Sequence, residues 1–168
     1  MLTIPRPVID DMIVHARDLD PHECCGMLGG NEGIVSQHYR ITNILAKLSE
    51  GELARFDAPK LSDLKQLSPE ERADIAFQMD AQEMGKALRD MRNKGIALQA
   101  FYHSHTFSPA RPSQTDITIA MEFESYREKL NLPEPFHIII SLLDKHSPDI
   151  RAYQIRKGQS MEVQTLIS

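Results

Sequence analysis

The segment from Phe136 to Leu143, FHIIISLL, constrains the fold of this 168-residue chain more than any other segment. A run of eight residues without a charged side chain is typical of a strand that is buried on both faces. Residues 95–103, GIALQAFYH, predict a second strand that is largely buried. Because stretches of helical spacing alternate with these strands, we expect one α/β or α+β domain, in which a central mixed β-sheet packs against helices.

Three further stretches have the apolar spacing of amphipathic helices. They are residues 7–18, 80–93 and 113–131. Asp80 is expected to cap the second helix, with Glu83 three residues later, and Gly95 is expected to end it. Strands are predicted over residues 23–30 and 33–42, paired as a hairpin, and one or two terminal strands over residues 149–168.

Residues 46–75 have the weakest pattern in the chain. They are polar, contain two prolines and show no sustained periodicity of apolar residues. Loops of this length in compact domains are usually functional or disordered. We therefore expect a surface loop or lid with short helical turns, inserted into a single domain that spans residues 1–168.

Composition excludes several classes of partner. The net charge of −5, the absence of Trp and the aromatic content of 6% are unsuited to binding nucleic acid. No apolar run approaches the roughly 20 residues that cross a bilayer, and Asp10 and Asp11 interrupt any signal-like N-terminus. Cys24 and Cys25 are adjacent and cannot form an ordinary disulfide without strain. A reducing, cytoplasmic setting is the resulting expectation.

A metal site is predicted by the stretch FYHSHTFSPARPSQTD. His103 and His105 are two residues apart at the end of a predicted strand, so both imidazoles are expected on one face. Asp116 lies at the start of the next predicted helix, where the helix dipole favours a carboxylate. Two nitrogens and one oxygen, with a fourth position left for water, are typical of catalytic zinc sites.

Each of these residues also has a simpler interpretation. A lone histidine beside a buried strand is usually a hydrogen-bonded core residue. Ser113 and Asp116, three residues apart, are equally a plain helix-capping pair. The capping interpretation is compatible with a metal site. Neither interpretation explains why two histidines share one strand face close to a carboxylate at a helix start.

These residues resemble the signature of the JAMM (MPN+) metallopeptidases, which is H-S-H, seven residues, and then S-x-x-D. Members also carry an upstream glutamate followed by a Cys-Gly run, and Glu23 matches that glutamate. Ala110 and Pro112 match residues that bacterial members often have before the serine. The resemblance covers roughly residues 6–156 apart from the insertion. Many members have proline directly after the second histidine, where this chain has Thr106, which puts the loop geometry in doubt.

The resemblance implies an MPN/JAMM-like domain with Zn²⁺ bound by His103, His105 and Asp116. By the same resemblance, Glu23 is the general acid and base, and Ser113 donates a hydrogen bond to the oxyanion. The family hydrolyses peptide or isopeptide bonds at the C-terminus of ubiquitin-like proteins. Small bacterial members resemble peptidases that trim sulfur-carrier proteins ending in Gly-Gly. A ubiquitin-like β-grasp or sulfur-carrier protein is therefore the expected substrate.

Two other functions remain open. Many relatives lack the metal ligands and serve as scaffolds or protein-binding modules, and a related fold occurs in DNA-repair proteins, which the negative charge disfavours. Cys24 and Cys25 are expected to be buried and to point to opposite faces of a strand. His22 is expected at the surface. The other histidines are expected to be structural or exposed, namely His15, His38, His137 and His146.

Overall fold

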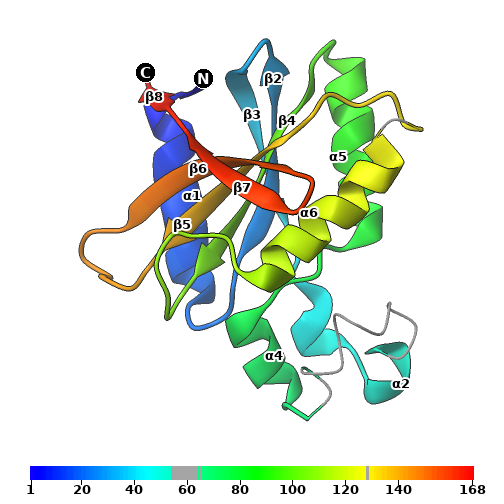
Figure 1. Cartoon of the computed structure of the whole chain (residues 1–168), viewed down its shortest axis with the longest axis vertical. Helices are drawn as coiled ribbons and strands as arrows, with labels where there is room; N and C mark the ends of the chain where they lie inside the picture. Colours follow the sequence, from blue (N-terminus) through cyan, green and yellow to red (C-terminus); the bar gives the residue numbers. More distant parts are fainter. Residues whose placement is uncertain (54–63, 65, 128) are drawn as a thin grey trace.

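The computed structural model describes residues 1–168 except 54–63, 65 and 128. Its strands, in chain order, are β1 (Leu2–Ile4), β2 (Cys25–Asn31), β3 (Ile34–Ile41), β4 (Ala97–His105), β5 (Phe136–Ser141), β6 (Asp149–Arg156), β7 (Gln159–Val163) and β8 (Thr165–Ile167). Within the described residues they form one mixed sheet in the order β7-β6-β5-β4-β2-β3-β1-β8 (Figure 1). β4 runs parallel to β5 and antiparallel to β2. The expected central mixed sheet is confirmed.

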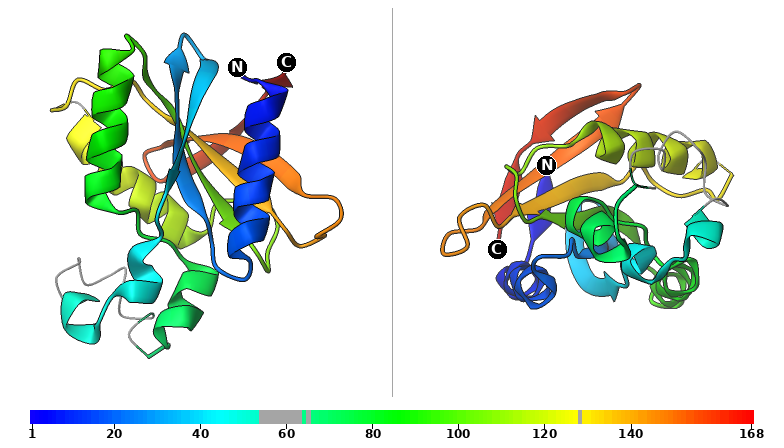
Figure 2. Two further views of the ribbon diagram at one scale, coloured as in Figure 1. Left: turned by 180° about the vertical axis from the view of Figure 1, so that it is seen from behind. Right: turned by 90° about the horizontal axis from the view of Figure 1, so that it is seen from below.

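Helices cover both faces of this sheet. Helix α1 (Arg6–Leu19) lies on one side of β2 and β3, and α5 (Ala81–Asn93) lies on the other (Figure 2). Helix α6 (Gln114–Arg127) packs on the same face as α5. Successive residues of β4 therefore face different layers: Tyr102 packs with α1, and Phe101 packs with α5 and α6. In the described part of the chain, no helix has both the length and the apolar character that crossing a membrane requires.

The structure confirms the three predicted helices and the predicted hairpin. Asp80 caps α5 as expected, because its side chain accepts a hydrogen bond from the Glu83 amide. The C-terminal region forms three strands rather than one or two, because β7 pairs with β6 and the residues after Gln164 pair with β1. The three-residue strand β1 was too short for its sequence pattern to predict it.

The insertion has structure of its own. It contains the helices α2 (Glu50–Leu53) and α4 (Pro69–Ile75), and the 3-10 helix η1 (Ile44–Lys47) overlaps its start. These helices lie beyond one end of the sheet (Figure 1). They share a small apolar cluster whose buried members are Leu45, Leu53, Leu64, Ala73 and Ala76. The short helical turns expected here are therefore present. The rest of the expected loop, residues 54–63 and 65, lies outside the described residues.

Candidate metal centre

The carboxyl end of β4 presents two buried imidazoles to the first turn of α6. His103 and His105 are 6% and 5% exposed, and their Nε2 atoms lie 3.0 Å apart. Asp116 Oδ1 lies 3.2 Å from Nε2 of His103, and Asp116 Oδ2 lies 3.1 Å from Nε2 of His105. One ligand atom from each residue lies within 4.8 Å of the other two. The three residues that the sequence predicted as ligands thus converge on one point.

The charges and spacing of this cluster suit a bound cation. Two ligand atoms at the usual zinc distance and tetrahedral angle are about 3.3 Å apart, close to the separations seen here. Burial alone would raise the pKa of Asp116, but the charge of His103 and hydrogen bonds from both imidazoles outweigh it and hold the pKa below its usual range. The Asp116 carboxylate is therefore negatively charged, as a ligand of a cation must be. With two nitrogens and one oxygen, the donor set fits zinc.

Neighbouring groups orient these ligands. Nδ1 of His105 lies 2.9 Å from the Pro109 carbonyl oxygen. Because a carbonyl only accepts, Nδ1 carries the proton when the ring is neutral, and the lone pair of Nε2 faces the cluster. The Ser113 amide donates to Asp116 Oδ2 at 2.7 Å, and the Ser113 hydroxyl accepts from the Asp116 amide at 3.1 Å. The capping arrangement is therefore present together with the metal-like cluster.

Glu23 lies beside this cluster. The antiparallel β2–β4 ladder pairs Cys25 with His103, and Glu23 precedes Cys25 by two residues, so the chain brings Glu23 towards the end of β4 that carries His105. Its side chain is 5% exposed, and its Oε2 atom has no hydrogen-bond partner among the described residues. Burial, and secondly the charge of Asp116, raise the pKa of Glu23 well above its usual value. Glu23 is therefore a buried carboxyl group, and a nearby cation would stabilise its charged form.

The cysteines are not part of the cluster. Cys24 packs in the core under α1 and Cys25 in the core under α5, which confirms that they point to opposite faces. Burial raises the pKa of the Cys24 thiol to about 12 and that of Cys25 well above its usual value. Both are therefore thiols in the metal-free chain, and neither belongs to the group formed by His103, His105 and Asp116. The expectation that His22 lies at the surface was only partly right, because it is half-buried, with Nδ1 2.6 Å from Asp74 Oδ1.

Two aromatic contacts around the site could not be predicted from the sequence. The Phe77 ring stacks on His103 with ring centroids 4.6 Å apart. On the other face of β4, the Tyr102 hydroxyl lies 2.6 Å from Nδ1 of His15 and 2.7 Å from Nε2 of His38. His15 and His38 are thus structural. Phe77 follows α4 in a stretch without a periodic pattern, so no local signal indicated its contact.

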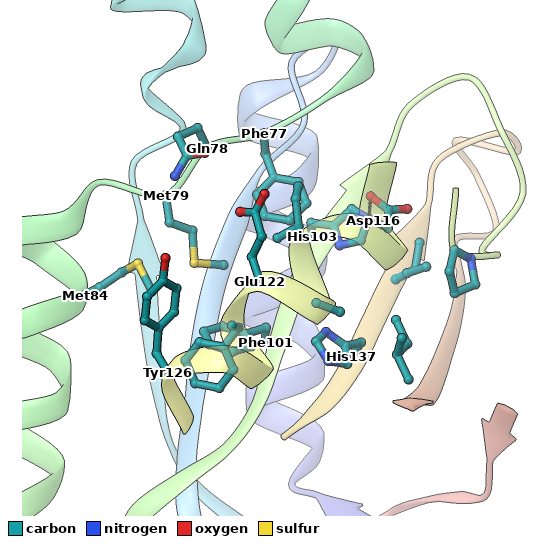
Figure 3. A pocket seen from close by; sticks show the side chains of 16 residues that line it. Phe77, Gln78, Met79, Met84, Phe101, His103, Asp116, Glu122, Tyr126 and His137 are labelled. Carbon is teal, nitrogen blue, oxygen red and sulfur yellow. Dashed lines mark ion pairs between the residues drawn. The ribbon is translucent and has the colours of Figure 1, made fainter. Parts of the chain in front are cut away.

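A mainly apolar pocket adjoins the cluster (Figure 3). His103 and Asp116 lie at one side of it, and Met84 and Tyr126 lie at the other. Most of its wall is apolar and comes from α6, β4 and the segment after α4, with Phe77, Met79, Phe101, Ile119 and Phe123 among its members. The carboxylate of Glu122 also lines it. An extended chain lying in this pocket would end at the metal ligands.

The comparison with protein families decides the assignment. A family model described as prokaryotic homologs of the JAB domain matches residues 5–156. The chain belongs to this family. It is 27% identical over 164 residues to the CysO-cysteine peptidases of Mycobacterium tuberculosis and Mycobacterium bovis, covering 96% of this chain and 88% of theirs. The JAMM/MPN relationship expected from the sequence is confirmed.

Solved structures agree with this JAB-family fold. A protein from Desulfitobacterium hafniense is 27% identical, with a TM-score of 0.68 over 100% of this chain and 93% of that one. A JAB1/MPN domain protein from Archaeoglobus fulgidus is 16% identical, with a TM-score of 0.52 over 99% of this chain and 97% of that one. The fold is therefore a mixed α/β, MPN-like domain.

Proposed function

We propose that this JAB-family protein is a zinc-dependent peptidase. Its substrate is a sulfur-carrier or other ubiquitin-like protein, which it cuts after a Gly-Gly sequence near the C-terminus. The proposal is carried by one observation: His103, His105 and Asp116 converge beside a buried glutamate whose Oε2 atom has no partner among the described residues. The similarity to the CysO-cysteine peptidases supports the choice of substrate.

Each residue of the site has one task in this reaction. A zinc ion held by the three ligands would lower the pKa of water toward about 7 and polarise the substrate carbonyl. Glu23 takes the proton that water loses as its oxygen bonds to the carbonyl carbon. The same carboxyl group gives this proton to the amide nitrogen as the carbon–nitrogen bond breaks. The Ser113 hydroxyl, which accepts from the Asp116 amide, donates its hydrogen to the developing oxyanion.

The pocket suits the part of the substrate that precedes the cut bond. Two of the three proposed ligands, His103 and Asp116, line the pocket, and Glu23 does not. The leaving nitrogen must lie next to Glu23, so it lies outside the pocket. Two glycines, which have no side chains, can pass close to the ligands. The side chain before them then enters the apolar pocket, since an extended chain advances about 3.3 Å per residue.

A carrier-trimming assay tests the proposal. The substrate is a β-grasp carrier ending in Gly-Gly that is extended by one cysteine, and mass spectrometry measures the loss of that residue. We expect trimming with one zinc per chain and none after chelation, and a carrier with Gly-Ala in place of Gly-Gly serves as the control. If the zinc-loaded protein leaves the carrier intact, the substrate assignment is wrong. If it also fails to bind zinc, a non-catalytic binding module becomes the better description.

The residue before the two glycines should control the rate. Peptides ending in Leu-Gly-Gly-Cys should have a kcat/KM at least about tenfold higher than peptides ending in Asp-Gly-Gly-Cys, because burying a leucine contributes roughly 1.5–3 kcal/mol. Glu122 would also repel the aspartate. Chromatographic measurement of released cysteine checks this, and a methionine peptide controls for volume. Equal rates would show that the pocket does not hold this side chain.

Replacing Ser113 separates its two tasks. Ser113→Ala should lower kcat by roughly 10²- to 10³-fold by removing an oxyanion donor. It should also cost about 1 kcal/mol of folding free energy, because the hydroxyl accepts from the Asp116 amide. Ser113→Thr keeps the hydroxyl and should keep most of the activity. Steady-state kinetics and urea unfolding measure the two effects, and an alanine variant with normal kcat would remove Ser113 from the mechanism.

A further inference from the structure

The two faces of β4 make different kinds of contact. His103 and His105 face the metal cluster. The side chains that alternate with them are Tyr102, Ser104 and Thr106, which are 0%, 0% and 3% exposed. Their hydroxyl groups all form hydrogen bonds to other parts of the chain. This second face of the strand therefore fixes neighbouring segments relative to the ligands.

Glu23 depends on its main chain for its position. Its Oε2 atom has no hydrogen-bond partner among the described residues, so this oxygen is not anchored directly. It also lies outside the regular ladder, because β2 begins at Cys25. Contacts to the backbone on either side of Glu23 must therefore set the distance between its carboxylate and the ligands.

Two hydroxyl groups flanking His105 make such contacts. The Thr106 hydroxyl donates to the Pro21 carbonyl oxygen at 3.0 Å, and the Asp74 carbonyl oxygen lies 3.4 Å away. The Ser104 hydroxyl accepts from the Cys24 amide at 2.8 Å. The strand that carries the metal ligands thus holds the chain both before and after Glu23.

Helix α4 of the insertion joins the same segment. The Glu23 amide donates to the Ala73 carbonyl oxygen at 2.7 Å. Nδ2 of Asn43 donates to the carbonyl oxygens of Glu23 and Ala76, at 3.0 and 3.1 Å. The Thr106 side chain reaches both the residues before Glu23 and the end of α4. The His22 side chain makes a second link between these segments, with Nδ1 2.6 Å from Asp74 Oδ1.

We infer that Thr106 is a positioning residue for the Glu23 carboxylate. Its hydroxyl joins the end of β4, the segment from Pro21 to Cys24, and α4. The inference rests on the proposed function, in which Glu23 moves the proton. A displacement of about 1 Å at a catalytic group can cost up to about 10²-fold in rate, so one lost hydrogen bond at this point should be measurable.

Three variants test the inference. Thr106→Val has the same shape without the hydroxyl, and Thr106→Ser keeps the hydroxyl. Thr42→Val is the matched control, because the Thr42 hydroxyl likewise donates a hydrogen bond, to the Glu83 carboxylate at 2.8 Å. Each variant is measured for kcat and KM on the extended carrier, for zinc affinity by calorimetry, and for amide hydrogen exchange of residues 22–24.

We expect Thr106→Val to lose roughly 10- to 100-fold in kcat while KM and zinc affinity stay unchanged. Its amides at residues 22–24 should exchange faster, and Thr106→Ser and Thr42→Val should behave like the unmodified protein. A valine variant with normal kcat, or a serine variant as slow as the valine variant, overturns the inference. If the unmodified protein hydrolyses nothing, the proposed function fails, and unchanged exchange in Thr106→Val then also overturns the positioning role.

Discussion

Glu23→Gln should abolish most of the hydrolysis while leaving zinc binding intact. Glutamine has the shape of glutamate but cannot take a proton from water, and general acid–base catalysis contributes roughly 10²- to 10⁴-fold. We therefore expect kcat on the extended carrier to fall by about 10³-fold, with KM little changed. Zinc stoichiometry, measured by calorimetry, should remain one per chain because Glu23 is not a ligand.

The same substitution should stabilise the metal-free protein at neutral pH. The folded-state pKa of Glu23 is raised by burial and by the charge of Asp116. When folding raises the pKa of a carboxyl group, the group contributes its full stabilisation below the pKa of the unfolded chain, near 4.3. That stabilisation is lost as the pH rises through the pKa of the folded state. Glu23→Gln should thus raise Tm at pH 7 and have little effect at pH 4.

Calorimetry at the two pH values, with and without zinc, checks this prediction. Bound zinc should reduce the rise in Tm that Glu23→Gln causes, because the cation favours the charged carboxylate of Glu23. Asp149→Asn, which removes an exposed carboxylate on β6 paired with Arg151, is a suitable control. If the metal-free Glu23→Gln variant is less stable than the unmodified protein at pH 7, the contacts of the Glu23 carboxylate outweigh the cost of burying its charge.

The cluster of His103, His105 and Asp116 could be predicted because its placement depends on local geometry. A strand places His103 and His105 on one face, and a helix start favours Asp116 near them. Glu23 is different, because only its resemblance to a family signature singled it out. Its burial follows from the pairing of β2 with β4, which lies outside any local pattern.

The contacts of Thr106 and of the insertion could not be predicted for a related reason. Helices α2 and α4 have four and seven residues, too few to display an apolar period. Their stability comes from packing. Ser68 and Glu71 form a capping box at α4, but its short motif does not stand out within a polar stretch. The contact between Thr106 and Pro21 joins residues that lie 85 positions apart.

Zinc should stabilise the folded chain strongly, through Asp116. Binding to the folded state alone contributes RT ln(1 + [Zn]/Kd), which is about 4 kcal/mol when free zinc is 1,000-fold above Kd. For a chain of this size, Tm should rise by roughly 8–16 °C. Because histidine ligands must be unprotonated, and Asp116 raises the pKa of His105 despite its burial, the effect should weaken as the pH falls.

Asp116→Asn should remove most of this rise in Tm. The asparagine side-chain oxygen can still accept from the Ser113 amide, which now donates to Asp116 at 2.7 Å, so the start of α6 should remain capped. The negative charge that offsets the ion is lost. Thermal scans with and without zinc measure the difference, with Asp149→Asn again as the control. If zinc stabilises the Asp116→Asn variant as much as the unmodified protein, the ion binds elsewhere, and both the metal centre and the peptidase function derived from it are wrong.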